Sequence, residues 1–140
     1  MWVYFAHASD RAQERMLPLV RASGQPVLFT HTMLRRFHHA ERGISADQLQ
    51  AVRDTKGLVG VMTAHDMLAG TRTLDVELAG YAALAAQMRE IGLVIGEPST
   101  VFGSDYNGGV RHLPPLGEAG RGTSLATEGF WNVSQAGELW

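Results

Sequence analysis

The sequence predicts an α/β fold built from parallel βα units. Four short apolar runs rich in β-branched and aromatic residues lie between Trp2 and Ser104, and the three intervals between them carry helix signals. Strands that alternate with helices form a parallel sheet with right-handed crossovers. Because a closed eight-stranded barrel needs about 200 residues or more, the 140 residues of this chain suffice for about half of a (β/α)8 barrel.

The first two predicted strands are Trp2–Ala6 and Pro26–Thr30, continuous apolar runs of the kind that parallel sheets bury on both faces. Between them, Ser9 or Asp10 can cap a helix. We expect this helix to end near Leu17, because Pro18 has no amide proton with which to continue it.

The next helix and strand have clear boundaries. Ser45 is placed as the N-cap, and Gln48 lies three residues later, where a capping box needs it. Gly57 is suited to end the helix, and Leu58–Met62 follows as the third strand. We expect residues 63–73 to form a connecting loop.

The last helix and strand are followed by a long loop region. Residues 92–96 fit either a strand start or a loop, Thr100–Ser104 is the fourth strand, and glycine and proline clusters predict loops from Tyr106 onward. Residues 129–140 look like the start of a helix that does not develop. The longest helix is predicted from apolar residues at steps of three and four: Leu74, Leu78, Tyr81, Leu84, Met88 and Ile91.

Composition and charge exclude several classes of protein. The apolar fraction is 45%, the charged fraction 19% and the net charge −2, so no electrostatic argument supports binding to nucleic acid or to an anionic membrane. There is no cysteine, which excludes disulfides, thiolate nucleophiles and Cys-ligated zinc. No apolar run reaches the length of a membrane span, and Trp2–Ala6 is too short for a signal peptide, so the sequence indicates no compartment.

Polar side chains follow three of the predicted strands. His7 follows the first strand, His31 the second and Asp105 the fourth. The carboxyl ends of parallel strands meet at one edge of a sheet, where ligands of α/β proteins bind. Two imidazoles and a carboxylate at that edge can form a metal site or the acid–base part of one. The alternatives are ordinary strand-end histidines and, for Asp105, a cap or turn residue before Asn107.

The segment after His31 is rich in arginine and histidine. Arg42 can bind a carboxylate through two parallel hydrogen bonds, or it can be a solvated loop residue. Arg35 and Arg36 are interpreted as surface charges, and His65 as an exposed loop residue. The adjacent histidines of this loop do not form the His-Glu-x-x-His zinc signature, because the spacing differs.

Five short segments of the sequence carry a family resemblance. They occur in this order: Ala6–Arg11 (AHASDR), Pro26–Thr32 (PVLFTHT), Arg42–Leu49 (RGISADQL), Gly57–Val61 (GLVGV) and Gly103–Gly108 (GSDYNG). With these segments the chain resembles the C-terminal half of the membrane (renal) dipeptidase family of zinc metallopeptidases. The resemblance extends from His7 to about Trp140.

The resemblance implies a barrel of the metallo-dependent hydrolase type with two zinc ions at its C-terminal face. It also implies hydrolysis of dipeptides, often with a D-residue at the C-terminal position. His7 and His31 match the two histidine ligands of the second zinc ion. Arg42 matches the arginine that holds the substrate carboxylate, and Asp105 matches the catalytic aspartate.

The sequence also departs from the family. The family's His-x-Asp pair and its bridging glutamate belong to an N-terminal half that is missing here, as is a last helix with a substrate-contacting asparagine. Tyr106-Asn107 stands where the family more often has Phe-Asp. Since a zinc site needs at least three protein ligands, we expect residues 1–140, as a single partial domain, to bind zinc weakly or not at all and to be inactive alone.

Three functions remain open from the sequence. The first is a zinc-dependent dipeptidase, represented by its C-terminal part. The second is a catalytically inactive remnant or subunit that needs another chain, as a homo-oligomer or with the N-terminal half, to complete the barrel. The third is a small doubly wound α/β binding domain whose histidines and aspartate fall at strand ends by coincidence.

Overall fold

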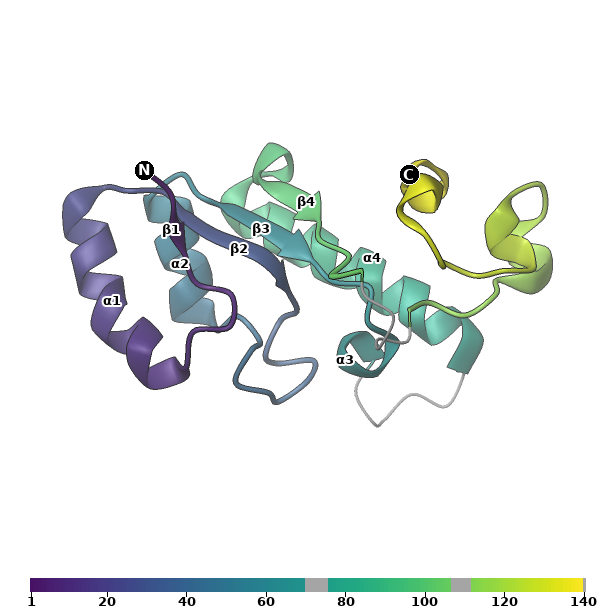
Figure 1. Cartoon of the computed structure of the whole chain (residues 1–140), viewed down its shortest axis with the longest axis horizontal. Helices are drawn as coiled ribbons and strands as arrows, with labels where there is room; N and C mark the ends of the chain where they lie inside the picture. The colour runs from purple at the N-terminus through teal and green to yellow at the C-terminus, as the bar shows by residue number, and fades with distance from the viewer. Residues whose placement is uncertain (70–75, 107–111, 140) are drawn as a thin grey trace.

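The computed structural model describes residues 1–69, 76–106 and 112–139. Four parallel strands form one sheet in the same order as along the chain (Figure 1). A doubly wound sheet reverses its strand order at a switch point, so this sheet has the arrangement of a barrel segment and not that of the doubly wound alternative. The strands are β1 (Val3–Tyr4), β2 (Val27–Thr32), β3 (Leu58–Val61) and β4 (Thr100–Phe102).

In the described part of the chain, four α-helices accompany the strands: α1 (Asp10–Ser23), α2 (Ala46–Asp54), α3 (His65–Ala69) and α4 (Val76–Ile95). Because each right-handed crossover moves one strand onward in the same direction, the connecting helices fall on one side of the sheet. There α1 packs on α2, α2 packs on α4, and α4 packs on β3 and β4 (Figure 1). Within the described residues, no helix is both long enough and apolar enough to cross a bilayer.

The face of the sheet beneath these helices carries the hydrophobic core. Along β2, Val27 and Phe29 are buried, whereas Leu28 and Thr30 are only partly buried. This alternation is expected of a strand with one covered and one open face. Phe5 packs edge-on against Phe29, with ring centroids 5.7 Å apart. The less buried face is the one that a closed barrel would turn inward.

Helix α1 continues through Pro18, so the prediction that it ends near Leu17 is wrong. It runs for 14 residues to Ser23, and Gly24 ends it with φ 64°. Pro18 is exposed, so the carbonyl that loses its partner can hydrogen-bond to water. Leu17 and Val20 are buried in the core on the other side. Packing of this apolar stripe outweighs one missing hydrogen bond.

Helix α2 confirms the predicted capping box. The Ser45 hydroxyl accepts a hydrogen bond from the Gln48 N–H at 3.3 Å, and Gln48 Oε1 accepts one from the Ser45 N–H at 2.7 Å. At the other end the left-handed residue is Lys56, with φ 54°, and not the predicted Gly57. Gly57 is required for a different reason, because a Cβ there would lie 2.0 Å from the Val27 carbonyl oxygen.

Two segments without a predicted helix contain helix: residues 63–73, expected as a loop, and residues 92–96, expected as a strand start or a loop. The segment 63–73 holds α3, since Leu68 is buried there and its carbonyl accepts a hydrogen bond from Gln87 of α4 at 3.1 Å. Residues 92–95 are the end of α4. Leu74 and the side chain of Leu78 lie outside the described part of the chain. The other elements of the described residues are 3-10 turns: η2 (Glu97–Ser99), η3 (Gly117–Gly120), η4 (Ser124–Ala126) and η5 (Val133–Leu139).

Candidate active site

The carboxyl edge of the sheet brings three of the predicted site residues together. The Nε2 atoms of His7 and His31 are 2.7 Å apart, and His31 Nε2 lies 3.7 Å from Asp105 Oδ2. His7 follows β1, His31 belongs to β2 and Asp105 follows β4. Parallel strands in chain order therefore gather side chains that are up to 98 residues apart in sequence (105 − 7).

Two of these residues have a backbone conformation that favours glycine. φ is 66° at His7 and 52° at Asp105, whereas the Cβ of an L-residue makes positive φ unfavourable. Residues held in such conformations persist only where the surrounding structure fixes them, and they cluster at active sites. The backbone at both positions thus supports a functional role for this edge.

His31 is held by an irregularity in β2. The register of β2 against β3 shifts just before the end of the strand, and the Thr30 carbonyl oxygen reaches over Gly60 and Gly103. A Cβ on these glycines would lie 2.1 and 2.0 Å from that oxygen, so only glycine leaves room for it. Sequence reasoning misses both residues, although a glycine inside or next to a strand is a signal for a bulge or a close approach.

The imidazole of His31 is also fixed on its other side. Its Nδ1 is 2.9 Å from Thr30 Oγ1, which is itself 3.0 Å from the Tyr4 hydroxyl. Burial lowers the pKa of His31, and the nearby His7 and Arg42 lower it as well, while the neighbouring carboxylate opposes them. A lowered pKa favours the neutral imidazole, which is the form that binds metals and accepts protons.

Arg42 joins the cluster from the loop after β2. Its Nη2 lies 3.3 Å from Asp105 Oδ2, and its backbone carbonyl accepts a hydrogen bond from Thr32 Oγ1 at 2.8 Å. Its Nε is buried and has no hydrogen-bond partner among the described residues. Because a buried donor without a partner is unfavourable, this guanidinium is suited to bind an added anion, and a carboxylate matches its geometry.

The imidazole and carboxylate groups at this edge are of the kind that binds zinc, but they are too few to complete a zinc site. Zinc binds imidazole nitrogens at about 2.0–2.1 Å in tetrahedral geometry, which places two of them about 3.3 Å apart. His7 Nε2 and His31 Nε2, now 2.7 Å apart, would have to separate by about 0.6 Å to reach that spacing. Over residues 1–69, 76–106 and 112–139, no group of three or more His, Cys, Asp or Glu side chains is arranged to hold a metal ion.

A buried histidine, His112, lies near the cluster. His112 is 9% exposed, its ring stacks on Tyr106 at a centroid distance of 4.2 Å, and its Nδ1 is 2.8 Å from Thr63 Oγ1. Burial lowers the pKa of His112, against the opposite effect of Asp105. Sequence reasoning misses His112, because no periodic pattern in its glycine- and proline-rich segment indicates burial. His65, expected to be exposed, is partly buried.

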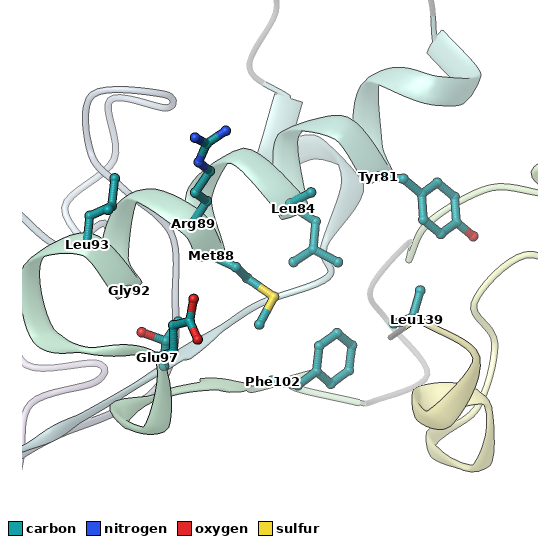
Figure 2. A pocket seen from close by; sticks show the side chains of 11 residues that line it. Tyr81, Leu84, Met88, Arg89, Gly92, Leu93, Glu97, Phe102 and Leu139 are labelled. Atoms are coloured by element: carbon teal, nitrogen blue, oxygen red, sulfur yellow. The ribbon is translucent and has the colours of Figure 1, made fainter.

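A large apolar cavity lies elsewhere. Its volume is about 740 Å³, and it lies between α4, β4 and the end of η5. Figure 2 shows Leu84, Met88 and Phe102 around this space, with Leu139 on the side of η5. None of the four predicted site residues lines it. The cavity therefore belongs to the packing beside β4 and not to the polar site.

Several solved structures share the fold of this chain. The dipeptidase AC, a metallopeptidase of family M19, matches with a TM-score of 0.62 at 22% identity, over 74% of this chain and 29% of that one. The probable dipeptidase PvdM from Pseudomonas aeruginosa matches with 0.62 at 16% identity, over 81% and 40%. A metallopeptidase from Rhodobacter sphaeroides, liganded with a phosphinate mimic of the dipeptide L-Ala-D-Ala, matches with 0.51 at 19% identity, over 69% and 33%.

The sheet in chain order and these matches show a parallel α/β fold of the barrel type. The sequence model of the membrane dipeptidase family, peptidase family M19, matches residues 1–128, and the chain belongs to this family. The fold class and the family that the sequence resemblance indicates are thereby confirmed. The chain spans 29–40% of the length of the three solved structures. No curated protein is similar enough to match.

Proposed function

We propose that this chain supplies part of the active site of a zinc-dependent dipeptidase. The observation that carries the proposal is the convergence of His31 and Arg42 on Asp105, at 3.7 and 3.3 Å. An imidazole, a carboxylate and a guanidinium at one edge provide a metal donor, an acid–base group and a carboxylate binder. Membership of a metallopeptidase family supports the same class of reaction.

His7 and His31 would hold one zinc ion through their Nε2 atoms. When bound, zinc polarises the scissile carbonyl and makes hydroxide available near neutral pH. Thr30 keeps the His31 ring oriented from its Nδ1 side, as the outer hydrogen-bond partners of metal-binding histidines do. Because zinc requires at least three protein ligands, the site needs further donors, and the family resemblance assigns those to an N-terminal half with a second zinc ion.

Asp105 would act as the general acid/base, and Arg42 would hold the C-terminal carboxylate of the dipeptide. The carboxylate of Asp105 lies within reach of both a proposed metal ligand and the proposed substrate binder. That position suits delivery of a proton to the leaving amine. The L-Ala-D-Ala mimic bound by the metallopeptidase from Rhodobacter sphaeroides supports dipeptides with a C-terminal D-residue as the substrate class.

The length of the chain favours a second proposal, that residues 1–140 are inactive alone. The chain spans 29–40% of the solved relatives, and its sheet has four strands, whereas about eight are needed to close a barrel. A complementary N-terminal half, or a second copy, would then complete both the barrel and the ligand set.

An assay of zinc-dependent Gly-D-Ala hydrolysis tests both proposals. We expect no activity from the chain alone and activity when an N-terminal half of the family barrel is added. Asp105→Asn should abolish that activity, whereas the matched control Asp66→Asn, at an exposed position of α3, should retain it. Equal activity of the two variants would contradict the role of Asp105. A nanomolar zinc site in the isolated chain, found by calorimetry, would contradict the incomplete ligand set.

A further inference from the structure

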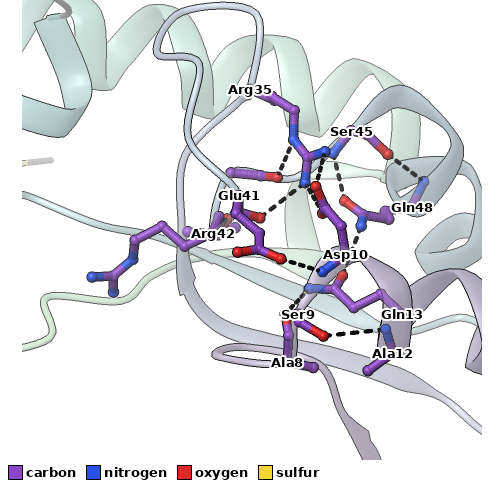
Figure 3. Close-up of polar contacts among 12 residues, drawn as sticks. Ala8, Ser9, Asp10, Ala12, Gln13, Arg35, Glu41, Arg42, Ser45 and Gln48 are labelled. Atoms are coloured by element: carbon purple, nitrogen blue, oxygen red, sulfur yellow. Dashed lines mark hydrogen bonds and ion pairs between the residues drawn. The ribbon is translucent and has the colours of Figure 1, made fainter.

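Arg35 lies at the centre of a hydrogen-bond network that ties two loops of the site together. Its Nη1 and Nη2 donate to both carboxylate oxygens of Asp10, at 2.9 and 2.6 Å. Its Nε donates to the Gly43 carbonyl at 2.9 Å, and its Nη2 also donates to the Glu41 carbonyl at 2.9 Å (Figure 3). The interpretation of Arg35 as a plain surface charge is wrong, because its guanidinium donates four hydrogen bonds to three partners.

Asp10 is held from two directions. It is the first residue of α1, where a carboxylate interacts favourably with the helix dipole. Its backbone N–H donates to Glu41 Oε1 at 2.8 Å, while its side chain accepts from Arg35. The segment after β1, which carries His7, is thereby bound to the loop after β2, which carries Arg42.

A pair of buried amides reinforces this connection. Gln13 Nε2 donates to the Ala8 carbonyl at 2.6 Å, and Gln48 Nε2 donates to Gln13 Oε1 at 2.7 Å. Both glutamine side chains are buried. The residue next to His7 is thus connected through α1 to the N-terminus of α2.

The network fixes the backbone on both sides of Arg42. The carbonyl oxygens of Glu41 and Gly43 accept from Arg35, and the carbonyl of Arg42 itself accepts from Thr32 Oγ1. Three successive carbonyls are therefore bound. Figure 3 shows the side chain of Arg42 pointing away from this network, and its Nη2 reaches Asp105 at 3.3 Å. With the backbone of residues 41–43 held in this way, the position of the Arg42 guanidinium depends on the torsions of its own side chain.

We propose that Arg35 and Asp10 are positioning residues, a clamp that holds the Arg42 guanidinium at the carboxyl edge of the sheet where a dipeptide carboxylate would bind. Neither residue touches the substrate in this proposal, and both act through the backbone of residues 41–43. The consequence for catalysis rests on the role proposed above for Arg42, whereas the positioning itself does not.

The test compares Arg35→Gln and Asp10→Asn with the control Arg36→Gln in the 140-residue chain. Arg36 is the neighbouring arginine, has a more exposed side chain (63% against 26%) and pairs with Glu90 of α4. Hydrogen exchange measured by NMR reports on the protection of the backbone amides of Gly43 and Ile44. The Nε–H signal of Arg42 reports on the environment of the guanidinium, and it is identified by its loss in Arg42→Lys.

We expect both clamp variants to exchange at Gly43 and Ile44 at least about tenfold faster, since hydrogen bonds to charged groups are the stronger ones. The Arg42 Nε–H signal should move toward the position of an exposed arginine. Arg36→Gln should change neither readout. Asp10→Asn keeps the shape of the side chain. It therefore provides the test of the clamp if Arg35→Gln does not fold.

Unchanged exchange in both clamp variants would overturn the proposal. Faster exchange with an unmoved Arg42 signal would also overturn it, because the clamp would then stabilise the loop without positioning Arg42. In a preparation that hydrolyses dipeptides, Arg35→Gln should raise KM with little change in kcat. If no preparation hydrolyses dipeptides, the proposed function fails while the NMR result still decides the positioning role.

Discussion

The close approach of the Thr30 carbonyl to Gly60 and Gly103 predicts that an alanine at either glycine displaces His31. The added Cβ would lie 2.1 or 2.0 Å from the Thr30 oxygen, whereas real Cβ atoms essentially never come within 3.0 Å of such a neighbour. The Thr30 peptide would have to move by about 1 Å, and packing too many atoms into a filled site typically costs about 1–3 kcal/mol. His31 is the next residue and would move with it.

Urea unfolding followed by circular dichroism measures the loss of stability. We expect Gly60→Ala and Gly103→Ala to lower the free energy of unfolding by about 1–3 kcal/mol, which corresponds to roughly 3–10 °C in Tm for a chain of this size. The matched control is Gly137→Ala, where a Cβ meets no atom within 4 Å. It should change stability by less than about 0.5 kcal/mol.

The position of His31 is read separately by NMR of the imidazole nitrogens. The signals of His31 should shift in both glycine variants and stay in place in Gly137→Ala, because His7 Nε2 lies 2.7 Å from the displaced ring. A Gly103→Ala variant with the stability of the unchanged protein and unmoved His31 signals would refute the reasoning.

Three further predictions concern stability and pH. Lys56→Gly should raise the free energy of unfolding by about 0.5–1 kcal/mol in urea titrations, because φ is 54° at Lys56 and glycine removes most of the resulting strain at some entropic cost. An unchanged free energy of unfolding would argue against backbone strain at Lys56. Phe29→Ala, at a fully buried position, should lower the free energy of unfolding by about 3–5 kcal/mol. The control Leu19→Ala, at an exposed position, should lower it by under about 0.5 kcal/mol. Equal urea midpoints in the two variants would contradict the assigned core. Burial holds the pKa of His112 below its ordinary 6.5 in the folded chain, so the unfolded chain binds more protons below that pH and stability is lost as the pH falls. The urea midpoint should therefore fall less between about pH 7 and pH 5 in His112→Gln than in the unchanged protein. An equal fall in the two proteins would contradict this.

The elements that local signals define are predictable from the sequence. The capping box at Ser45 and the apolar runs of β2 and β3 depend on residues within one turn or one strand. The parallel sheet follows from the alternation of strands with helices, and it allowed His7, His31 and Asp105 to be expected at one edge, where the structure has them. Their roles as metal ligands and acid–base group stay predictions.

The features that the sequence does not reveal depend on contacts between distant segments. Helix α3 forms because Leu68 is buried against α4, which no local pattern indicates. The clamp joins Arg35 to Asp10, 25 residues earlier, and the room for the Thr30 carbonyl comes from Gly60 in β3 and Gly103 directly after β4. Such pairs are set by strand register and loop path, which are properties of the whole fold.

The left-handed backbone at His7 and Asp105 gives a rule for comparing this chain with its homologues. Glycine would relax the turn at both positions and would remove an imidazole and a carboxylate at the same time. A homologous sequence with glycine at either position would therefore have a less strained turn and would lack the side chain on which the role proposed for that position depends.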